Sequence, residues 1–549
     1  MKKNGFAILF FTVFTCFLFA QNHMDIMTTM TGEHNFANMG LAMTTLDWNG
    51  DGYDDLIVNS QNWDPRGFTP SYPPFPYGKL YVYFGGPGFD NIPEMEIPGH
   101  HEIEFCHTTA MCNAGDMNGD GIDDLALFRA TMYEDGNDQH YDSQLCVFYG
   151  GADPDTIPDY VLTFPREEWD VASYNEVQCL GDIDHDGFSD IGYAIGHADF
   201  YSPYNFGIIY GGSMENTIFS NIGNRQDWGD IRGVGDINAD GISDFCIGYL
   251  NGTLSNNEHR VVLYYGSTSR IFSDSLVIAD TPLLYNAYSY PVGNINMDGI
   301  SDFASSFAYS NAKLYFGCSD FDGSQNETIT PSYNGDTAGM GFAHGDVNGN
   351  GTDDLMGTFC SQADGYGDAY LWIGGVPMNG TSDLHITPDM NHNMEMFGWC
   401  LTMGDYNGDG YCDAAISAPF DYASWPYPGE VIVYAGNPQL NDPTPIADNT
   451  NTPEISKLQI YPNPLQPQKS ELNVKFGCYN SQSPESKREL STFEIYNIKG
   501  QKVKSYSIDA DHTKKGTASY NLENLSSGVY ICILTTGQRI QHGKITIIR

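Results

Sequence analysis

Short apolar runs bounded by glycine, proline, asparagine and aspartate recur along most of the chain. The most regular set ends in glycine or another small residue and reads "KLYVYFGG", "QLCVFYGG", "FGIIYGG", "VVLYYGS", "AKLYFGC", "AYLWIGG" and "EVIVYAG". Short runs rich in β-branched and aromatic residues and bounded by turn residues are typical of strands. Helical periodicity is nearly absent, so we expect an all-β protein.

Each of these runs belongs to a longer repeat. A second apolar run, such as "DDLIV" or "DFCIG", comes before it and directly follows an acidic stretch that occurs seven times. The mean spacing of about 60 residues indicates a repeat architecture. A further short run precedes each acidic stretch, and a weaker one, such as "DYVLTF", closes the repeat. Four strands in each of seven repeats predict a seven-bladed β-propeller.

The last repeat lacks its fourth strand. After "EVIVYAG" the chain continues into "NPQLNDPTPIADNTNTPEI", which contains no strand pattern. The N-terminal segment "MDIMTTMT", residues 24–31, belongs to no repeat and is able to supply the missing strand. This pairing would remove the last open sheet edge.

The acidic stretches have the chemistry of a calcium loop. In "GDYNGDGYCDAAISAPF", Asp405, Asn407 and Asp409 occupy relative positions 1, 3 and 5, and Asp413 occupies position 9. Side-chain oxygens at these positions, with the main-chain carbonyl at position 7, can surround a hard cation at roughly 2.3–2.6 Å. Gly410 at position 6 permits the sharp turn that this requires.

The same positions in all seven stretches give the predicted ligands of up to seven Ca²⁺ ions. They are Asp47, Asn49, Asp51, Tyr53, Asp55; Asp116, Asn118, Asp120, Ile122, Asp124; Asp182, Asp184, Asp186, Phe188, Asp190; Asp236, Asn238, Asp240, Ile242, Asp244; Asn294, Asn296, Asp298, Ile300, Asp302; Asp346, Asn348, Asn350, Thr352, Asp354; and Asp405, Asn407, Asp409, Tyr411, Asp413.

The seven loops are not equal. The loop at Asp182 has four carboxylates and is expected to bind most tightly, whereas the loops at Asn294 and Asp346 have two each. For those two, a solvated acidic turn without metal is the competing interpretation. An EF-hand is excluded because that loop needs an acid at position 12. Position 12 is occupied here by Val58, Leu127, Tyr193, Ile247, Ser305, Gly357 and Ile416.

The seventh repeat, "FGWCLTMGDYNGDGYCDAAISAPF…GEVIVYAG", resembles the FG-GAP repeat of integrin α-subunit propellers and their bacterial relatives. The other six repeats keep the loop and the glycine-terminated strand but mostly lack the "FG" before the loop and the "AP" after the second strand. The resemblance covers about residues 24–437. It implies calcium between the first and second strands of each blade, and a ligand on the opposite face.

Three connections between predicted second and third strands are rich in aromatics: "RGFTPSYPPFPYG", "DFYSPYNFG" and "DYASWPYPG". Exposed tyrosine and tryptophan suit sugar rings or protein hot spots. We therefore predict an extracellular glycan or protein ligand on this face, with the alternative that these side chains only pack long loops together. The predicted binding residues are Tyr72, Phe75, Tyr77, Tyr204, Trp425 and Tyr427.

The ends of the chain indicate export. Residues 1–20, with Lys2, Lys3 and an apolar core, are typical of a secretory signal peptide. The predicted propeller, residues 21–437, is followed by a Pro/Asn/Asp/Thr linker, 438–455, and by a small Ig-like β-sandwich, 456–549. The blocks "YPNP", "YNIKGQKV" and "LSSGVYICIL" resemble the C-terminal sorting domain of type IX secretion. That resemblance implies the type IX machinery as a partner and delivery outside a Gram-negative cell. An Ig-like accessory module is the alternative.

The charge of the chain excludes some classes of partner, and its cysteine content leaves two disulfides open. Residues 21–450 hold 9 Lys/Arg against 62 Asp/Glu, which argues against nucleic acid and anionic lipid as partners. No run after the signal is long enough to span a membrane. Removal of the signal leaves eleven cysteines, of which Cys106–Cys112 and Cys400–Cys412 are close enough in sequence to pair, although spacing does not decide it.

The search for catalytic motifs finds none. Hydrolase, zincin and phosphate-binding motifs are absent from the sequence. "GHHEIEFCH", residues 99–107, could hold zinc but is more simply a solvated loop.

We expect a secreted or cell-surface calcium-binding propeller that acts as a binding or adhesion module. The alternatives are a polysaccharide-degrading enzyme and a structural surface-layer component.

Overall fold

The computed structural model divides into two units, Met1–Thr444 and Pro445–Arg549. The boundary falls within residues 438–455, the stretch expected to be a linker. The residues that the structure describes are 23–66, 76–100, 104–105, 110–135, 138–165, 175–195, 205–219, 229–253, 256–281, 287–307, 312–329, 341–360, 367–375, 378, 380–387, 396–419, 428–441, 459–461, 471–475, 491–497, 502–508, 517–522, 525, 528–536 and 539–547.

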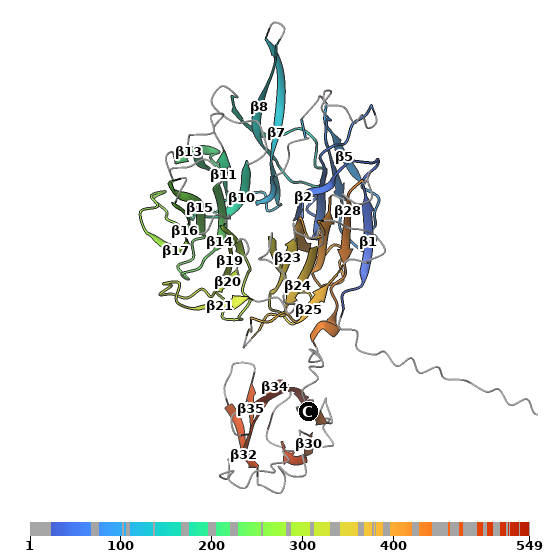
Figure 1. The fold of residues 1–549 in the computed structure, drawn as a ribbon. Coiled ribbons are helices and arrows are strands. Elements are labelled where there is room, and N and C mark those ends of the chain that lie inside the picture. The colour runs from blue at the N-terminus through green and yellow to red at the C-terminus, as the bar shows by residue number, and fades with distance from the viewer. Residues whose placement is uncertain are drawn as a thin grey trace, which may run out of the picture. The chain divides into compact units, whose positions relative to one another are not determined.

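The first unit is a seven-bladed β-propeller, as predicted. Seven antiparallel sheets of four strands are arranged around a common axis (Figure 1). The first blade contains β2 (Met39–Leu46), β3 (Asp55–Ser60), β4 (Lys79–Tyr83) and β5 (Met95–Pro98). The second contains β6 (Met111–Gly115), β7 (Asp124–Asp135), β8 (Asp138–Phe148) and β9 (Tyr160–Phe164). The third contains β10 (Glu176–Gly181), β11 (Asp190–Ile195), β12 (Asn205–Tyr210) and β13 (Glu215–Phe219).

The fourth to sixth blades repeat this plan. They are β14 (Gly229–Gly235), β15 (Asp244–Thr253), β16 (Asn256–Tyr264) and β17 (Ser275–Thr281); β18 (Ala287–Pro291), β19 (Phe303–Phe307), β20 (Ala312–Tyr315) and β21 (Asn326–Ile329); and β22 (Gly341–Gly345), β23 (Asp354–Cys360), β24 (Gly367–Trp372) and β25 (Leu384–Ile386).

The seventh blade joins the two ends of the propeller. It consists of β26 (Leu401–Gly404), β27 (Asp413–Ala418), β28 (Glu430–Tyr434) and the N-terminal strand β1 (Ile26–Thr31), which pairs antiparallel with β28. The expected closure by residues 24–31 is therefore confirmed. Met30 on β1 is buried against Val431 and Val433 of β28 and Met39 of the first blade.

The second and third strands of each blade are buried on both faces because neighbouring blades cover them. All six residues of β3 and all five of β4 are buried. This two-sided burial explains why these strands read as continuous apolar runs rather than as alternating ones. The innermost strands differ, since in β10 the partly exposed Glu176 and Gln178 alternate with the buried Val177.

Two blades carry longer hairpins than the sequence pattern indicated. β7 and β8 have 12 and 11 residues, and their hairpin extends beyond its neighbours at the top of Figure 1. β15 and β16 are also long. The missed segments, such as "RATMYEDGNDQHYDSQ", are polar and lack the apolar pattern from which the other strands were predicted.

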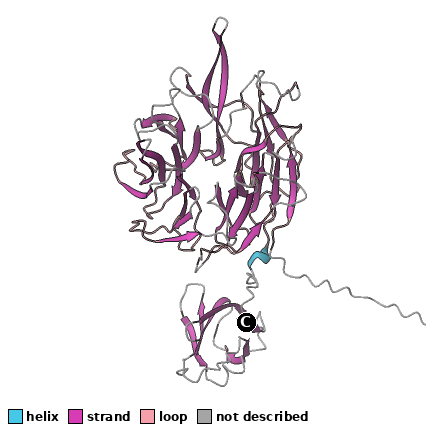
Figure 2. Ribbon diagram, viewed as in Figure 1, coloured by secondary structure: helices cyan, strands magenta, loops and turns pink. Residues whose placement is uncertain are grey.

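The second unit consists of two antiparallel sheets in its described part. One contains β29 (Gln459–Tyr461), β30 (Glu471–Lys475) and β33 (Thr517–Asn521). The other has the order β32 (Lys502–Ile508), β31 (Ser491–Asn497), β34 (Gly528–Thr536) and β35 (Arg539–Ile547). Figure 2 shows that strands dominate both units; the described residues contain one short 3₁₀ helix, η1 (Pro438–Asn441). The Ig-like class of this unit stays a prediction.

The suggested pairing of Cys400 with Cys412 is wrong, because both thiols are free. Cys112 is also free, and its suggested partner Cys106 lies outside the described residues. Cys146 and Cys246 are buried in the apolar cores, where cysteine acts as a small hydrophobic residue.

The closure predicts that Met30 carries a large share of the stability of the seventh blade. Met30→Ala should lower the free energy of unfolding by about 2–5 kcal/mol, because it leaves a cavity between β1 and its neighbours. Ile26→Ala, at an exposed position on the same strand, is the matched control and should change it by less than about 1 kcal/mol. Denaturant melts of both variants measure the difference. Equal effects would mean that β1 does not seal the ring.

Candidate functional site: the seven acidic loops and the opposite face

All seven acidic stretches connect the first strand of a blade to the second. The stretch from Asp47 joins β2 to β3, that from Asp182 joins β10 to β11, and that from Asp405 joins β26 to β27. Because the blades have the same topology, the seven loops lie on one face of the propeller. The connections between second and third strands lie on the other face.

Within each loop the ligand side chains are held by main-chain donors. In the first loop, Asp47 accepts hydrogen bonds from the N–H groups of Asp51 and Gly52 at 3.0 and 2.9 Å. Asn49 accepts from the N–H of Asp51 at 2.9 Å, and Asp51 accepts from the N–H of Tyr53 at 3.0 Å. Main-chain N–H groups of the same loop therefore hold these side chains before any cation is considered.

Two residues of every loop have left-handed backbone. Position 6 is glycine with φ between 83° and 94° in all seven loops, as the sequence predicted. Position 4 also has positive φ, although it is His185, Ala239 and Met297 in three loops. A non-glycine residue there costs roughly 1–2 kcal/mol. Sequence reasoning missed this position because its residue types vary.

The aspartate at position 9 is fully buried in every loop, and in six of the seven loops it joins two segments of its blade. Asp55 accepts hydrogen bonds from the N–H of Trp48, at position 2, and of Gly85, which follows the third strand, at 3.0 and 2.8 Å. The hydrogen bond from this glycine N–H to the position-9 carboxylate recurs at 2.7–2.9 Å in the other six blades. Burial raises the pKa of all seven carboxyl groups to about 7. A charged form therefore needs further stabilisation.

The glycine after the third strand is required by packing. A Cβ atom on any of these seven glycines would lie 1.9–2.4 Å from the main-chain oxygen of loop position 8. The sequence showed this glycine as the end of a strand, and the structure shows why no side chain fits. The seven residues are Gly85, Gly150, Gly211, Gly266, Gly317, Gly374 and Gly436.

The loops also connect neighbouring blades. The carbonyl of Trp48, at position 2 of the first loop, accepts a hydrogen bond from the N–H of Gly151 in the second blade at 2.9 Å. The equivalent bond occurs at all seven blade junctions at 2.7–3.0 Å, including that from Gly86 of the first blade to Tyr406 of the seventh. Each loop is thus part of an interface between blades.

The ligand atoms fit a hard cation. Oδ1 of Asn407, at position 3 of the seventh loop, is buried and accepts no hydrogen bond in the described structure. The same holds for Oδ1 of Asn294, at position 1 of the fifth loop. A buried oxygen without a donor carries a desolvation cost that a bound cation would remove. One oxygen each of Asp182, Asp184 and Asp190 lies within 4.8 Å of the others in the third loop.

The third loop contains a cation of the protein itself. Arg270, on the β16–β17 connection of the fourth blade, donates from Nε to Asp184 at 2.5 Å and from a terminal nitrogen to Asp186 at 3.3 Å. Its guanidinium also lies 4.0 Å from the centroid of the Tyr210 ring. Position 3 is asparagine in the other six loops, so the additional carboxylate of this loop is paired with Arg270. This pairing weakens the basis for expecting the tightest calcium binding here.

Most of the predicted ligand-face residues lie outside the described part of the chain. These are Tyr72, Phe75, Tyr204, Trp425 and Tyr427. The described one, Tyr77, is half-buried, and the guanidinium of Arg66 lies 5.0 Å from its ring centroid. Its main chain bonds to Trp63 and Phe105. These contacts give Tyr77 a role in loop packing. Most of the histidine-containing stretch 99–107 is also outside the described residues, but Glu104 pairs with Arg129 at 3.2 Å.

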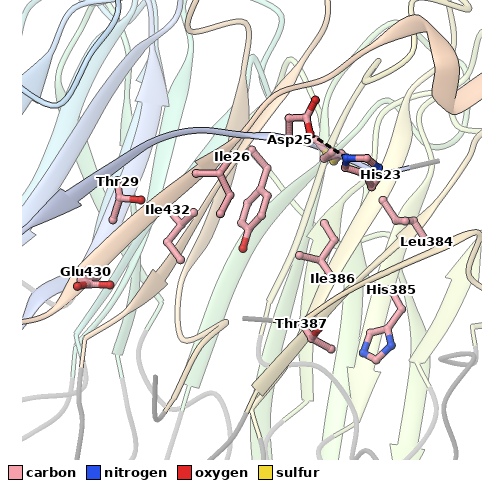
Figure 3. A pocket seen from close by; sticks show the side chains of 12 residues that line it. His23, Asp25, Ile26, Thr29, Leu384, His385, Ile386, Thr387, Glu430 and Ile432 are labelled. Atoms are coloured by element: carbon pink, nitrogen blue, oxygen red, sulfur yellow. Dashed lines mark hydrogen bonds and ion pairs between the residues drawn. The ribbon is translucent and has the colours of Figure 1, made fainter. Parts of the chain in front are cut away.

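A cavity of about 680 Å³ lies at the seam between the sixth and seventh blades (Figure 3). Ile26, Ile386 and Ile432 form its apolar part, and Nε2 of His23 bonds to Asp25 at 2.8 Å at one end. None of the predicted site residues lines it. Its position follows from the closure, because β1 and β25 face each other there.

The Arg270 contacts predict different stability losses with and without calcium. Arg270→Gln leaves the buried Asp184 carboxylate without its partner, which should cost about 1–3 kcal/mol in chelator. Calcium should reduce this loss, since it can neutralise the same carboxylates. The control is Arg129→Gln, which breaks an ion pair outside the loops and should cost the same in both conditions. Melting curves with and without calcium test this; an equal loss for Arg270→Gln would contradict the assignment.

Comparison with known proteins identifies the two parts of the chain separately. Residues 459–548 match the model of the secretion system C-terminal sorting domain family. Integrin alpha-PS2 of Drosophila melanogaster is 36% identical over 121 residues, which cover 20% of this chain and 8% of that integrin. The chain therefore matches only a small part of that relative's length.

Solved structures with a similar arrangement share little sequence. BBS1N in complex with ARL6DN is 12% identical, covering 75% of this chain and 97% of that chain, with a TM-score of 0.39. PorZ, a surface component of the type IX secretion system of Porphyromonas gingivalis, is 10% identical, covering 92% and 70%, with a TM-score of 0.29.

The described residues include no helix long and apolar enough to cross a membrane. The sorting domain assigns the protein to secretion or to the cell surface. The chain is thus a seven-bladed β-propeller protein that is similar over 121 residues to an integrin α subunit and that carries, at residues 459–548, a C-terminal sorting domain of the type IX secretion system.

Proposed function

We propose that the protein is a calcium-stabilised binding module that acts outside the cell, where it engages a glycan or protein ligand. The observation that carries the proposal is the conserved construction of the seven loops within one chain. Each carries carboxylate or amide oxygens at the same relative positions, and its position-2 carbonyl accepts a hydrogen bond from the next blade. Calcium prefers such oxygen ligands, and extracellular modules bind it at roughly 10⁻⁴–10⁻³ M.

Calcium would act structurally rather than chemically. The loops are formed from the ends of strands, and their carbonyls accept hydrogen bonds from the next blade. A cation in each loop would offset carboxylate repulsion at the blade junctions. The residues that would hold it are those predicted from the sequence at positions 1, 3, 5, 7 and 9, and the loop at Asn294 is the weakest candidate because its first ligand carries no charge.

The binding role rests on export together with the shape of the fold. A sorting domain delivers the propeller outside the cell, and a rigid ring leaves the second-to-third strand connections free to vary on one face. The long β7–β8 hairpin belongs to that face. A binding module needs such variable connections on a stable scaffold.

Calcium removal should lower the melting temperature of the purified protein. A ligand that binds only the folded state stabilises it by mass action, and seven sites add their effects. Melting in several millimolar calcium and in excess chelator measures this, with magnesium as the control for ionic strength and charge. An unchanged melting temperature in chelator would contradict the structural role of the loops.

Removal of the C-terminal unit should abolish export without unfolding the propeller. A chain ending at Asn441 keeps every propeller strand and Leu440, which packs with Met24. In a type IX host it should accumulate folded in the periplasm, whereas the full chain reaches the surface. Fractionation with circular dichroism measures both. Surface delivery of the truncated chain would refute the sorting role.

A further inference from the structure

The central channel of the propeller contains charged and aromatic side chains that neither the loops nor the sorting domain explain. The first strands of the blades enclose a cavity of about 500 Å³ along the axis. Cavities of this size are typical of small-molecule sites. Glu176, Arg232, Tyr288, Tyr290 and Trp399 are among its lining residues.

These side chains lie between the middle of the channel and its end away from the acidic loops. Glu176 is the first residue of β10, and Arg232 is the fourth of the seven residues of β14. Both strands run toward their acidic loops, which begin at Asp182 and Asp236. The cluster therefore extends from the middle of the channel toward the face where the second-to-third strand connections emerge.

Arg232 is fixed by neighbours on three blades. Its Nε donates to Asp230 at 2.8 Å, and a terminal nitrogen lies 3.9 Å from a carboxylate oxygen of Glu176. The guanidinium carbon lies 4.6 Å from the ring centroid of Tyr290 and 5.6 Å from that of Tyr288. The side chains of Arg232 and Glu176 keep 15% and 25% of their surface exposed, so both still face the channel.

The charged side chains that line the channel favour one class of ligand over the others. Two carboxyl groups surround one guanidinium, and the domain is strongly acidic, so an anionic ligand is disfavoured. A cationic ligand would need the tyrosine faces, which Arg232 already covers. A neutral polyhydroxylated molecule can accept hydrogen bonds from the guanidinium and donate them to the carboxylate, without needing the tyrosine faces. Desolvation raises the pKa of Glu176, which is consistent with a group kept partly away from water.

We propose that this end of the channel binds a neutral saccharide of one or two rings, held by Glu176 and Arg232 beside Trp399. The inference rests on the proposed binding function and assigns it a site and a ligand class. It places the site at the axis of the ring, whereas the aromatic connections would form the rim around it.

The test uses the full mature chain in calcium and a panel of neutral mono- and disaccharides: glucose, galactose, mannose, fucose, xylose, N-acetylglucosamine and their common dimers. Calorimetry identifies the strongest binder, which is then titrated into Glu176→Gln and Arg232→Lys. Glu176→Gln keeps the size of the side chain but removes the carboxylate. Arg232→Lys keeps the positive charge but removes the planar fork of the guanidinium. Both should weaken binding at least tenfold.

Glu104→Gln is the matched control, because Glu104 is a buried acid paired with an arginine outside the channel. It should change the affinity less than twofold. If one channel variant fails to fold, Gln178→Ala, on the same side of β10 and lining the channel, replaces it. Melting curves show which variants are folded.

The outcomes separate this inference from the proposed function. Saccharide binding that survives both channel variants but is lost in Trp425→Ala, Tyr427→Ala overturns the channel site and leaves the binding function intact. Binding only to a protein or to a cationic probe such as arginine overturns the ligand class. If the chain binds neither saccharides nor extracellular matrix proteins, the binding function itself fails, and the channel site fails with it.

Discussion

The buried aspartate at position 9 of each loop is the group on which the rest of the propeller depends. In six of the seven loops its two oxygens accept hydrogen bonds from the loop before it and from the glycine after the third strand, as Asp55 does from Trp48 and Gly85. The carbonyl of that same position-2 residue accepts a bond from the next blade. One carboxylate therefore links three strands of a blade to its neighbour, and the link repeats around the ring.

This arrangement explains why so much negative charge is tolerated. Main-chain N–H groups donate to the carboxylates of the loops, as in the first loop, which satisfies some of their acceptor capacity. The remaining charge is the reason to propose calcium. In the third loop the protein supplies a cation of its own, because Arg270 reaches from the fourth blade to Asp184 and Asp186. A fixed guanidinium and a bound ion would there stabilise the same junction.

Much of the fold could be predicted because its signals are local and repeated. The nine-residue loops, the glycine-terminated strands and the unassigned segment 24–31 together indicated seven blades and the closure of the ring. Contacts between distant residues could not be predicted. Arg270 lies 86 residues from Asp184, and the cluster of Glu176, Arg232 and Tyr290 joins three blades, so neither leaves a motif. The spacing of Cys400 and Cys412 left a disulfide between them open, and the structure shows both thiols free.

The most direct test of the account is the number of calcium ions that the folded protein binds. Equilibrium dialysis against several millimolar calcium, followed by elemental analysis, measures this number per chain. Occupation of the loops predicts about five to seven ions, with those at Asn294 and Asp346 the last to fill. A result below one ion per folded chain would contradict calcium as the cation at the blade junctions.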